Sequence, residues 1–517
     1  MNPTLPSRHP ACLRRPLAIL IATMALGGCA SLQPEPLKLA KLQEAVQADR
    51  DRHTKDIEPL AGMLTLEEAI ARAIKYNADR RMKAMEQAVA EGALDVANYD
   101  ILPKLVASAG YRDRDSDLIT RSKDSITGAP SLANPFISSS RTATTADLTF
   151  SWSLLDFGQS YYAAKQNADR VLIANERKRK ALHLLVQDVR TAYWRVVAAQ
   201  SLGGNVRNAI KEAEFALQDA RKAEGERLRN PLEPLRFQRQ LLENIRLLEA
   251  VEQELSTAST ELAALVSLPL NQAIKVSLPT VDLQRAWLDK PISRLEEQAL
   301  ARNADISEGF YNSRIAREET RRAMLKLFPG ISFNYGSKHS DDEYLINKSW
   351  QETGAQISFN LFGLLSAPSQ MKLADAGVAL ADQKRLVTQM AVLTQLHVAR
   401  LQFANTLRQY ERADAIADVE ARLANHVANQ ADAEKQTKLD RVSQQTSLIL
   451  AQLRRFQALS NTHAAASKLQ ATLGMEPVVE AKGTDTLGDL VAAVSKALKL
   501  WESGTLPEPA FASTAKE

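Results

Sequence analysis

The sequence predicts a mainly α fold in which very long helices and four short strands arise from a duplicated repeat. The first observation is a direct passage from a strand into a helix. Leu148, Phe150 and Trp152 alternate with Thr and Ser residues, the period of two that places apolar side chains on one face of a strand. From Leu182 to Val196 the apolar residues recur at helical spacing instead.

The second observation is that the chain makes this passage twice. Apolar and polar residues alternate again over 355–361 before another long helical pattern, and Phe359 lies 207 residues after Trp152. Segment 230–242 matches segment 438–448 at the same offset. An offset of this size indicates duplication of a large unit rather than a short solenoid repeat.

The third observation locates the difference between the two copies. The sequence Asn-Ala-Asp at 77–79 recurs at 303–305, at an offset of 226 residues. A Pro that ends the next helical pattern, Pro103 or Pro329, has the same offset. Because the offset then falls to 207, we expect the 19-residue difference to lie in the loop between the two strands of each copy.

Composition agrees with long helices. Only 5% of the 517 residues are aromatic, which suits helical bundles better than a thick globular core. The net charge of +4 is small for this length and gives no reason to expect a nucleic-acid partner.

The N-terminal segment 1–28 has the pattern of a lipoprotein signal peptide. Arg14 and Arg15 precede an apolar stretch, 17–26, that is too short to span a bilayer. The sequence Leu-Gly-Gly-Cys that ends at Cys29 resembles a bacterial lipobox. The resemblance implies cleavage before Cys29 and attachment of lipid, including palmitate, to this cysteine. The alternative is an ordinary signal peptide that contains a cysteine.

Cleavage at this position leaves Cys29 as the single cysteine of the mature chain, because Cys12 is removed with the signal. No intrachain disulfide is then expected. The polar residues that follow, 29–64, have the composition of a tether between the lipid and the folded protein.

The duplication sets the expected order of the remaining chain. We expect a first repeat at 65–270 with strands near 104–112 and 146–155, a connector at 271–291, a second repeat at 292–477 with strands near 330–336 and 354–362, and a tail at 478–517. The tail contains one amphipathic segment, 487–501.

Each repeat is expected to pair one long helix with two shorter helices stacked end to end. At ~1.5 Å per residue, helix 158–224 spans ~99 Å, and helices 77–103 and 232–268 together span ~93 Å. Gly203-Gly204 predicts a kink or a local break in the long helix. The corresponding helices of the second repeat are expected at 366–431 and 439–473.

Four strands cannot close a barrel, and a sheet that faces lipid cannot have an open edge. Three chains would supply twelve strands, an even number within the known range of membrane barrels. Closure therefore predicts a homotrimer with a 12-stranded β-barrel, continued by an α-helical tube. The apolar strand faces, including Phe150, Trp152, Phe333 and Phe359, would contact outer-membrane lipid. The alternative is that these aromatics pack inside a soluble sandwich.

These features together resemble the TolC-type outer-membrane efflux protein family. The motifs that carry the resemblance are LEEAIARAIKYNAD at 66–79, FSWSLLDFGQ at 150–159 and the endings at 265–268 and 471–474. The resemblance implies a passive exit duct of a tripartite efflux or type I secretion system. It implies as partners a periplasmic adaptor (membrane fusion) protein and an inner-membrane pump or ABC exporter. It also implies a lipid-anchored location in the outer membrane, with a long periplasmic extension.

Glu233 and Asp440 occupy equivalent positions in the two repeats, each just after the turn between a long helix and its return helix. The resemblance implies that acids here narrow the periplasmic end of the pore and form a gate, a role that Asp440 matches better than Glu233. Ser443 stands where the family often has a second acid. The alternative is that both acids are favoured by the positive end of the helix dipole.

The two helical turns are also basic. Arg227 and Arg229 lie on the first turn, and Lys435 and Lys438 on the second. These cations could hold a closed state through ion pairs or form a docking tip for the adaptor. A solvated charged surface is the alternative.

The sequence predicts no enzyme, no cofactor and no metal site. The seven histidines have no spacing typical of metal ligands, and phosphate loops and nucleophile motifs are absent. We interpret the histidines as solvated or packed side chains. The competing functional hypotheses are a periplasmic coiled-coil adaptor or scaffold lipoprotein without a pore, and a periplasmic enzyme with a helical body.

Overall fold

The computed structural model describes residues 36–130, 135–225, 232–270, 272, 274–278, 285–432, 438–475 and 486–505. It divides into two compact units, Met1–Glu58 and Pro59–Glu517.

In the first unit, helix α2 (Leu39–Thr54) is exposed along its whole length. Its side chains interact with one another, since Gln47 donates to Asp51 at 2.9 Å and Arg52 to Asp49 at 3.5 Å. Such local pairs favour a helix. The segment expected as a polar tether therefore contains a helix that its composition did not predict.

The second unit contains both repeats. The first consists of α3 (Leu66–Tyr76), α4 (Ala78–Tyr99), β1 (Lys104–Asp113), β4 (Thr142–Ser153), α5 (Leu154–Gly225), α6 (Leu232–Ser256) and α7 (Ala258–Val266). The second consists of α8 (Ile292–Arg302), α9 (Ala304–Leu325), β5 (Gly330–Ser340), β6 (Ser349–Ser358), α10 (Gly363–Asp432) and α11 (Lys438–Thr472). Outside this plan are the short strands β2 (Ile119–Thr120) and β3 (Phe136–Ile137), the 3-10 turn η1 (Arg285–Trp287) and helix α12 (Leu487–Glu502).

The strands form one antiparallel sheet in the order β1-β4-β5-β6. Trp152 lies opposite Phe333, and Phe150 lies opposite Tyr335, so the two repeats meet at the β4–β5 pair. Because each repeat contributes one hairpin, β1 and β6 become the two edges of the sheet. The short strands β2 and β3 pair with each other within the β1–β4 loop.

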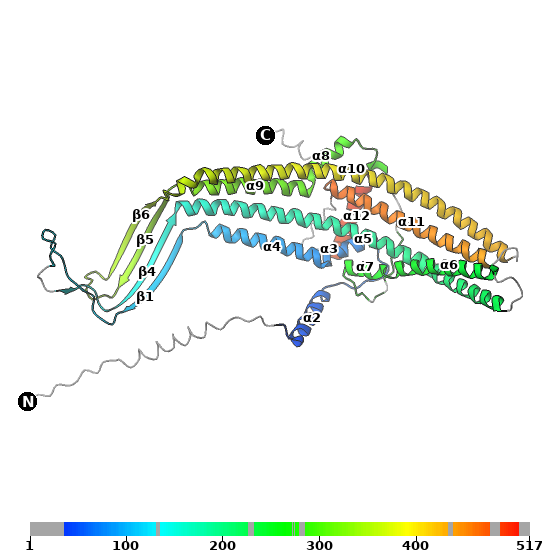
Figure 1. The fold of residues 1–517 in the computed structure, drawn as a ribbon, viewed down its shortest axis with the longest axis horizontal. Helices are drawn as coiled ribbons and strands as arrows, with labels where there is room; N and C mark the ends of the chain where they lie inside the picture. The colour runs from blue at the N-terminus through cyan, green and yellow to red at the C-terminus, as the bar shows by residue number, and fades with distance from the viewer. Residues whose placement is uncertain are drawn as a thin grey trace, which may run out of the picture. The chain divides into compact units, whose positions relative to one another are not determined.

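The helices that continue the strands also form a layer. α4 packs on α5, α5 on α9, and α9 on α10. In Figure 1 these four helices run side by side from the strands, and the α5–α6 and α10–α11 hairpins extend to the opposite end of this unit. The layer repeats the strand order, so α4 and α10 are its two edge helices.

The two repeats use the same joint where the shorter helices meet. Asn77 caps α4 by accepting from Arg80 N, and its Nδ2 donates to Leu265 O at 3.2 Å. Asn303 caps α9 by accepting from Asp305 N, and its Nδ2 donates to Thr472 O at 3.0 Å. One amide side chain thus starts one helix and satisfies a carbonyl at the end of the other.

The residue that ends the return helix adopts a left-handed backbone in both repeats. It is Ser267, with φ of 59°, in the first repeat and Gly474, with φ of 64°, in the second. A Cβ at Gly474 would lie 2.3 Å from Arg302 O, so only glycine fits there. The equivalent contact in the first repeat is a hydrogen bond of 3.1 Å from Ser267 Oγ to Tyr76 O.

We expected a kink or a local break at Gly203-Gly204, and the break is wrong, because α5 continues through both residues. The neighbouring side chains Leu202 and Val206 are buried in an apolar cluster with Leu248 of α6 and Leu453 of α11. Packing on both sides of the glycine pair therefore maintains the helix where local propensity would weaken it.

A break occurs instead in the first return helix, which was expected to be continuous over 232–268. α6 ends at Ser256 and α7 begins at Ala258. In an unbroken helix Ala258 N would donate to Glu254 O. Arg195 of α5 donates its Nη2 to that carbonyl at 3.3 Å. The competing donor comes from another helix, so the local sequence could not reveal it.

The fourth strand was expected at 354–362 but lies at Ser349–Ser358. Phe359, predicted as a strand residue, therefore lies one residue beyond β6, which corrects its placement. The reason is the start of α10, where Asn360 Oδ1 accepts from Gly363 N at 3.0 Å. An amide side chain in this position favours a helix start over further strand pairing.

Candidate functional site

The two edge helices expose apolar residues at the spacing of a coiled-coil seam. The α4 stripe consists of Met82, Met85, Val89, Val96 and Tyr99, and the α10 stripe of Leu373, Leu380, Val387, Met390 and Leu401. Val89 is 73% exposed and Val387 is 61% exposed. The α4 and α10 stripes lie at the same two sides of the unit as the sheet edges β1 and β6. The single chain is thus a wall segment with two unfinished sides.

The sheet carries aromatic side chains on one face. Phe150 and Trp152 of β4 are two residues apart, and Trp152 lies beside Phe333 of β5 with ring centroids 6.5 Å apart. Phe150 and Phe333 are both exposed. The intervening residues Thr149 and Ser151 point to the other face. The sheet therefore has an apolar and a polar face, as the sequence predicted.

Ion pairs join the two repeats along α5 and α9. Asp169 is buried and binds Arg314 through both of its oxygens. Hydrogen bonding to Asp169 raises the pKa of Arg314 above its ordinary value. Two further pairs follow along the same interface, Arg177 with Glu308 and Lys180 with Asp305, each at 2.7 Å. This part of the wall is polar and keeps its charges compensated.

The far end of the helical hairpins contains the predicted gate, and the structure describes part of it. Asp440 is exposed in the first turn of α11. The side chains of Glu233 and Lys438 lie outside the described residues, as do Arg227, Arg229 and Lys435.

The described residues near Asp440 include a contact that the sequence did not predict. Asn244 of α6 donates its Nδ2 to Ser443 Oγ of α11 at 3.1 Å. Arg441 lies 4.0 Å from Glu212 of α5. These contacts join the first hairpin to the second close to the predicted gate. The one available signal was Asn244 itself, a polar residue beside the apolar frame of α6.

The predicted lipidation site, Cys29, lies outside the described residues. None of the described helices combines the length and apolar character needed to cross a membrane.

Among the described residues, no three His, Cys, Asp or Glu side chains come close enough to hold a metal ion. His463 is packed rather than solvated, because its ring stacks on Trp194 with centroids 5.0 Å apart. His397 is exposed at the surface, where its Nε2 lies 2.8 Å from Glu296. These two histidines occupy the packed and surface positions that the sequence led us to expect.

No model of a known protein family matches the sequence, and no curated protein matches it. Solved structures do match its fold. The outer-membrane channel CmeC of Campylobacter jejuni is 14% identical, covers 84% of this chain and 89% of its own, and has a TM-score of 0.62. The MtrE outer-membrane channel of Neisseria gonorrhoeae, in its open state, is 14% identical over 79% of this chain and 88% of its own, with a TM-score of 0.60. The outer-membrane protein VceC of Vibrio cholerae is 16% identical over 79% of this chain and 96% of its own, with a TM-score of 0.58.

The chain therefore has the fold of solved outer-membrane channels. This is the fold that the resemblance to TolC-type proteins implied, with long paired helices and four strands per chain.

Proposed function

We propose that this protein is the exit duct of a tripartite efflux or type I secretion system in the outer membrane. It transports its cargo passively, and inner-membrane partners supply the energy. The observation that supports this proposal best is the pair of unfinished sides on a chain with an outer-membrane channel fold. A wall segment with an open edge on each side is suited to forming a closed tube with copies of itself.

Three copies would close both layers. The β6 edge of one chain would pair with the β1 edge of the next, which gives twelve strands, an even number within the known range for membrane barrels. At the same sides the α10 stripe of one chain would pack on the α4 stripe of the next, as two helices do in a coiled coil. The aromatic face of the sheet, including Phe150, Trp152 and Phe333, would then contact lipid. Phe359 would contact lipid just beyond the last strand.

This assembly predicts that Val387→Glu prevents trimer formation. The substitution places a carboxylate in the centre of the α10 stripe, and burying an unpaired charge at each of three interfaces costs several kcal/mol apiece. We expect the purified variant to have the mass of a monomer by light scattering in detergent, while the wild type has the mass of a trimer.

Ile126→Glu is the matched control, since it introduces the same charge at an exposed apolar position away from both stripes. It should leave the trimer intact. A trimeric Val387→Glu variant, or a monomeric wild type, would contradict the proposed closure.

The first hairpin end and the second would meet at the periplasmic tip, where we place the gate at Glu233 and Asp440. In a trimer these positions would supply six carboxylates at about one level of the tube. In planar bilayers we expect the wild-type protein to give a small, cation-selective single-channel conductance. The double variant Glu233→Ala/Asp440→Ala should conduct severalfold more or lose its selectivity, because the narrowing negative ring is gone.

The control for the gate is Glu249→Ala/Glu252→Ala, which removes two exposed acids of α6 beyond its first turn. It should conduct as the wild type does. If the double variant conducts as the wild type does, Glu233 and Asp440 stabilise the starts of their helices and do not gate the pore. The proposal of an exit duct would still hold. A folded trimer without any conductance would refute the duct.

The remaining parts of the proposal concern the partners and the anchor. The basic turn residues Arg227, Arg229, Lys435 and Lys438 would contact a periplasmic adaptor protein, which connects the duct to an inner-membrane pump or ABC exporter. Lipid on Cys29 would anchor the N-terminus in the outer membrane, and the helices would extend into the periplasm. A scaffold without a pore gives no role to the four-stranded sheet, so we favour the duct.

A further inference from the structure

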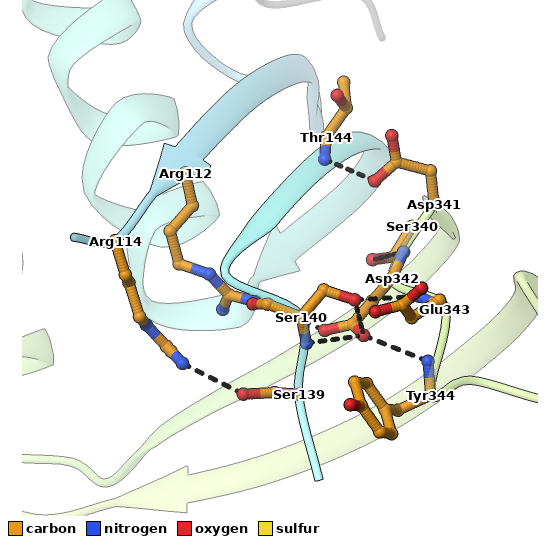
Figure 2. Close-up of polar contacts among 10 residues, drawn as sticks. All are labelled: Arg112, Arg114, Ser139, Ser140, Thr144, Ser340, Asp341, Asp342, Glu343 and Tyr344. Carbon is orange, nitrogen blue, oxygen red and sulfur yellow. Dashed lines mark hydrogen bonds and ion pairs between the residues drawn. The ribbon is translucent and has the colours of Figure 1, made fainter. Parts of the chain in front are cut away.

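At the end of the sheet away from the helices, the two strand connections lie against each other. Residues 114–141 connect β1 to β4, and residues 341–348 connect β5 to β6. The two connections come from different repeats and are about 200 residues apart in sequence. Figure 2 shows the polar side chains through which they meet.

Asp342 is at the centre of these contacts. Its Oδ1 accepts hydrogen bonds from Ser140 N at 3.0 Å, from Ser140 Oγ at 2.9 Å and from Tyr344 N at 3.2 Å. Its Oδ2 accepts from Arg112 Nη2 at 3.3 Å. An ionised carboxylate only accepts hydrogen bonds, and both of its oxygens are used here, Oδ1 by three donors and Oδ2 by one. We call the set Asp342, Ser140 and Arg112 the Asp342 clamp.

The neighbouring residues add further contacts, from the β5–β6 turn to the end of the β1–β4 loop and to the start of β4. Ser140 Oγ accepts from Glu343 N at 3.1 Å. Asp341 N donates to Thr144 O at 3.1 Å, and Thr144 N donates back to Asp341 Oδ1 at 2.5 Å. Three successive residues of the β5–β6 turn therefore bind segment 140–144, where the β1–β4 loop ends and β4 begins (Figure 2).

Asp342 and Ser140 of the clamp are enclosed, whereas Arg112 is exposed. Asp342 is 7% exposed and Ser140 is 8% exposed, whereas Ile346 in the same turn is 99% exposed. Hydrogen bonds from Ser140, Tyr344 and then the charge of Arg112 hold the pKa of Asp342 below its ordinary value. The carboxylate is therefore ionised at neutral pH, which is the form that can accept all four hydrogen bonds.

We propose that the Asp342 clamp fixes the base of the β1–β4 loop on the second hairpin and so sets the width of the outer mouth of the pore. The statement about the pore rests on the proposed function, whereas the statement about the loop does not. The long loop of the first repeat needs such an anchor more than the short turn of the second. Ordering a long connection costs more conformational entropy, and the β1–β4 pairing holds only its two ends.

The position of Arg112 lets the Asp342 carboxylate connect strands that are not neighbours in the sheet. Arg112 belongs to β1, whereas Asp342 follows β5, and β4 lies between these strands in the sheet. The Arg112–Asp342 ion pair therefore spans three strands and joins the edge hairpin of one repeat to the turn of the other. It acts together with the hydrogen bonds from Ser140, which hold the loop itself on the same turn.

The test is limited trypsin digestion of the purified full-length protein. Trypsin has target sites in the loop at Arg121 and Lys123, both exposed. Cleavage of a folded loop requires local opening, so its rate reports how firmly the loop is held. We expect Asp342→Ala to raise the rate of cleavage at these sites by about tenfold or more. Asp342→Asn, which keeps one acceptor oxygen but loses the charge, should give an intermediate rate.

Glu343→Ala is the matched control. Glu343 is the next acid in the same turn, and among the described residues its carboxylate makes no hydrogen bond or ion pair. This variant should be cleaved at the wild-type rate. Equal cleavage of Asp342→Ala and the wild type would overturn the clamp, and so would an equal rise in Glu343→Ala. Thermal unfolding of each variant shows whether the rest of the protein is intact.

Single-channel recording of the same variants tests the second half of the proposal. We expect Asp342→Ala to add current noise and additional conductance levels, because the released loop moves at the mouth. A loop that is cleaved faster without any change in current would overturn the role at the mouth and keep the clamp. A wild-type protein that does not conduct would refute the duct, and the cleavage result would still decide the clamp.

Discussion

Trp501→Ala is expected to lower the free energy of unfolding by about 3–5 kcal/mol, the usual cost of removing a buried aromatic side chain. The Trp501 ring is buried and stacks on Trp287 with centroids 4.2 Å apart and an interplanar angle of 18°. Trp287 Nε1 donates to the backbone oxygen of Trp501 at 2.9 Å. Alanine keeps this oxygen but leaves a cavity against Trp287.

Because of where Trp501 lies, its removal is expected to affect the stability of both repeats and not only the packing around Trp287. Near its start and middle, α12 buries Leu490 and Val494 in the core of the first repeat, together with Ile74 of α3. At its end Trp501 enters the core of the second repeat with Leu473. One helix of the tail thus joins both cores, and losing its last anchor weakens the contact between the repeats.

The measurement is denaturant unfolding followed by far-UV circular dichroism in detergent. Leu500→Ala is the matched control, since Leu500 is the adjacent residue on α12 and is 53% exposed. It should change the free energy of unfolding by less than about 0.5 kcal/mol. If the free energy of unfolding of Trp501→Ala lay within about 1 kcal/mol of the wild-type value, α12 would not stabilise the contact between the two cores.

The sequence predicted the fold well because its evidence is local and repeated. Alternation at Leu148, Phe150 and Trp152 requires only neighbouring residues, and a strand lies there. The helical stripes continue for many turns, so their signal accumulates. Duplication then supplied a second, independent reading of each pattern. The same logic located α12 at Leu487–Glu502, although its role between the two cores depends on contacts that periodicity does not describe.

Two of the failures, at the end of α6 and at the glycine pair of α5, involve contacts between distant segments. At the end of α6, Arg195 of another helix donates to Glu254 O, the carbonyl that Ala258 N of an unbroken return helix would use. Gly203-Gly204 has low helix propensity, but packing around Leu202 and Val206 outweighs it. In each case a residue far along the chain supplies the deciding interaction.

The Asp342 clamp shows the same limit at a candidate site. Ser140 and Asp342 are common loop residues, and each belongs to a segment that reads as polar. Only the pairing of β4 with β5 brings them together. The predicted tip residues are the opposite case, since the repeat offset alone equates Glu233 with Asp440 and their roles remain predictions.

Burial of His463 predicts that the protein loses stability in acid over a defined range. Burial, and then the charge of Arg190, lowers the pKa of His463 from 6.5 to about 3 in the folded state. The unfolded chain binds the proton near the ordinary value. Between these two values the unfolded state therefore holds more protons, and stability falls as the pH falls. Above pH 6.5 His463 is neutral in both states, and the protein keeps all of the stability that is lost when the unfolded chain binds this proton.

The size of the effect follows from the shift. Each pKa unit corresponds to about 1.4 kcal/mol, so the shift of His463 is equivalent to about 5 kcal/mol of stability that is lost by about pH 3. The surroundings explain why the folded state does not accept the proton. His463 stacks on Trp194, its Nε2 has no partner among the described residues, and Arg190 beside it is fully buried. The pKa of Arg190 falls only to about 10, so a protonated His463 would face a cation.

Unfolding free energies measured from pH 7 to pH 3 in the wild type and in His463→Phe test this prediction. Phenylalanine keeps an aromatic ring on Trp194 and cannot titrate. The difference between the two proteins cancels the other groups, including Glu502, whose charge acts on Arg190 from α12. The wild type should lose stability relative to His463→Phe as the pH falls below about 6.5. His426→Gln, a change at an exposed histidine, should follow the wild type. Parallel curves for the wild type and His463→Phe would mean that His463 is reached by water in the folded protein, and the packing of α5 on α11 would then be looser than the Trp194 stack indicates.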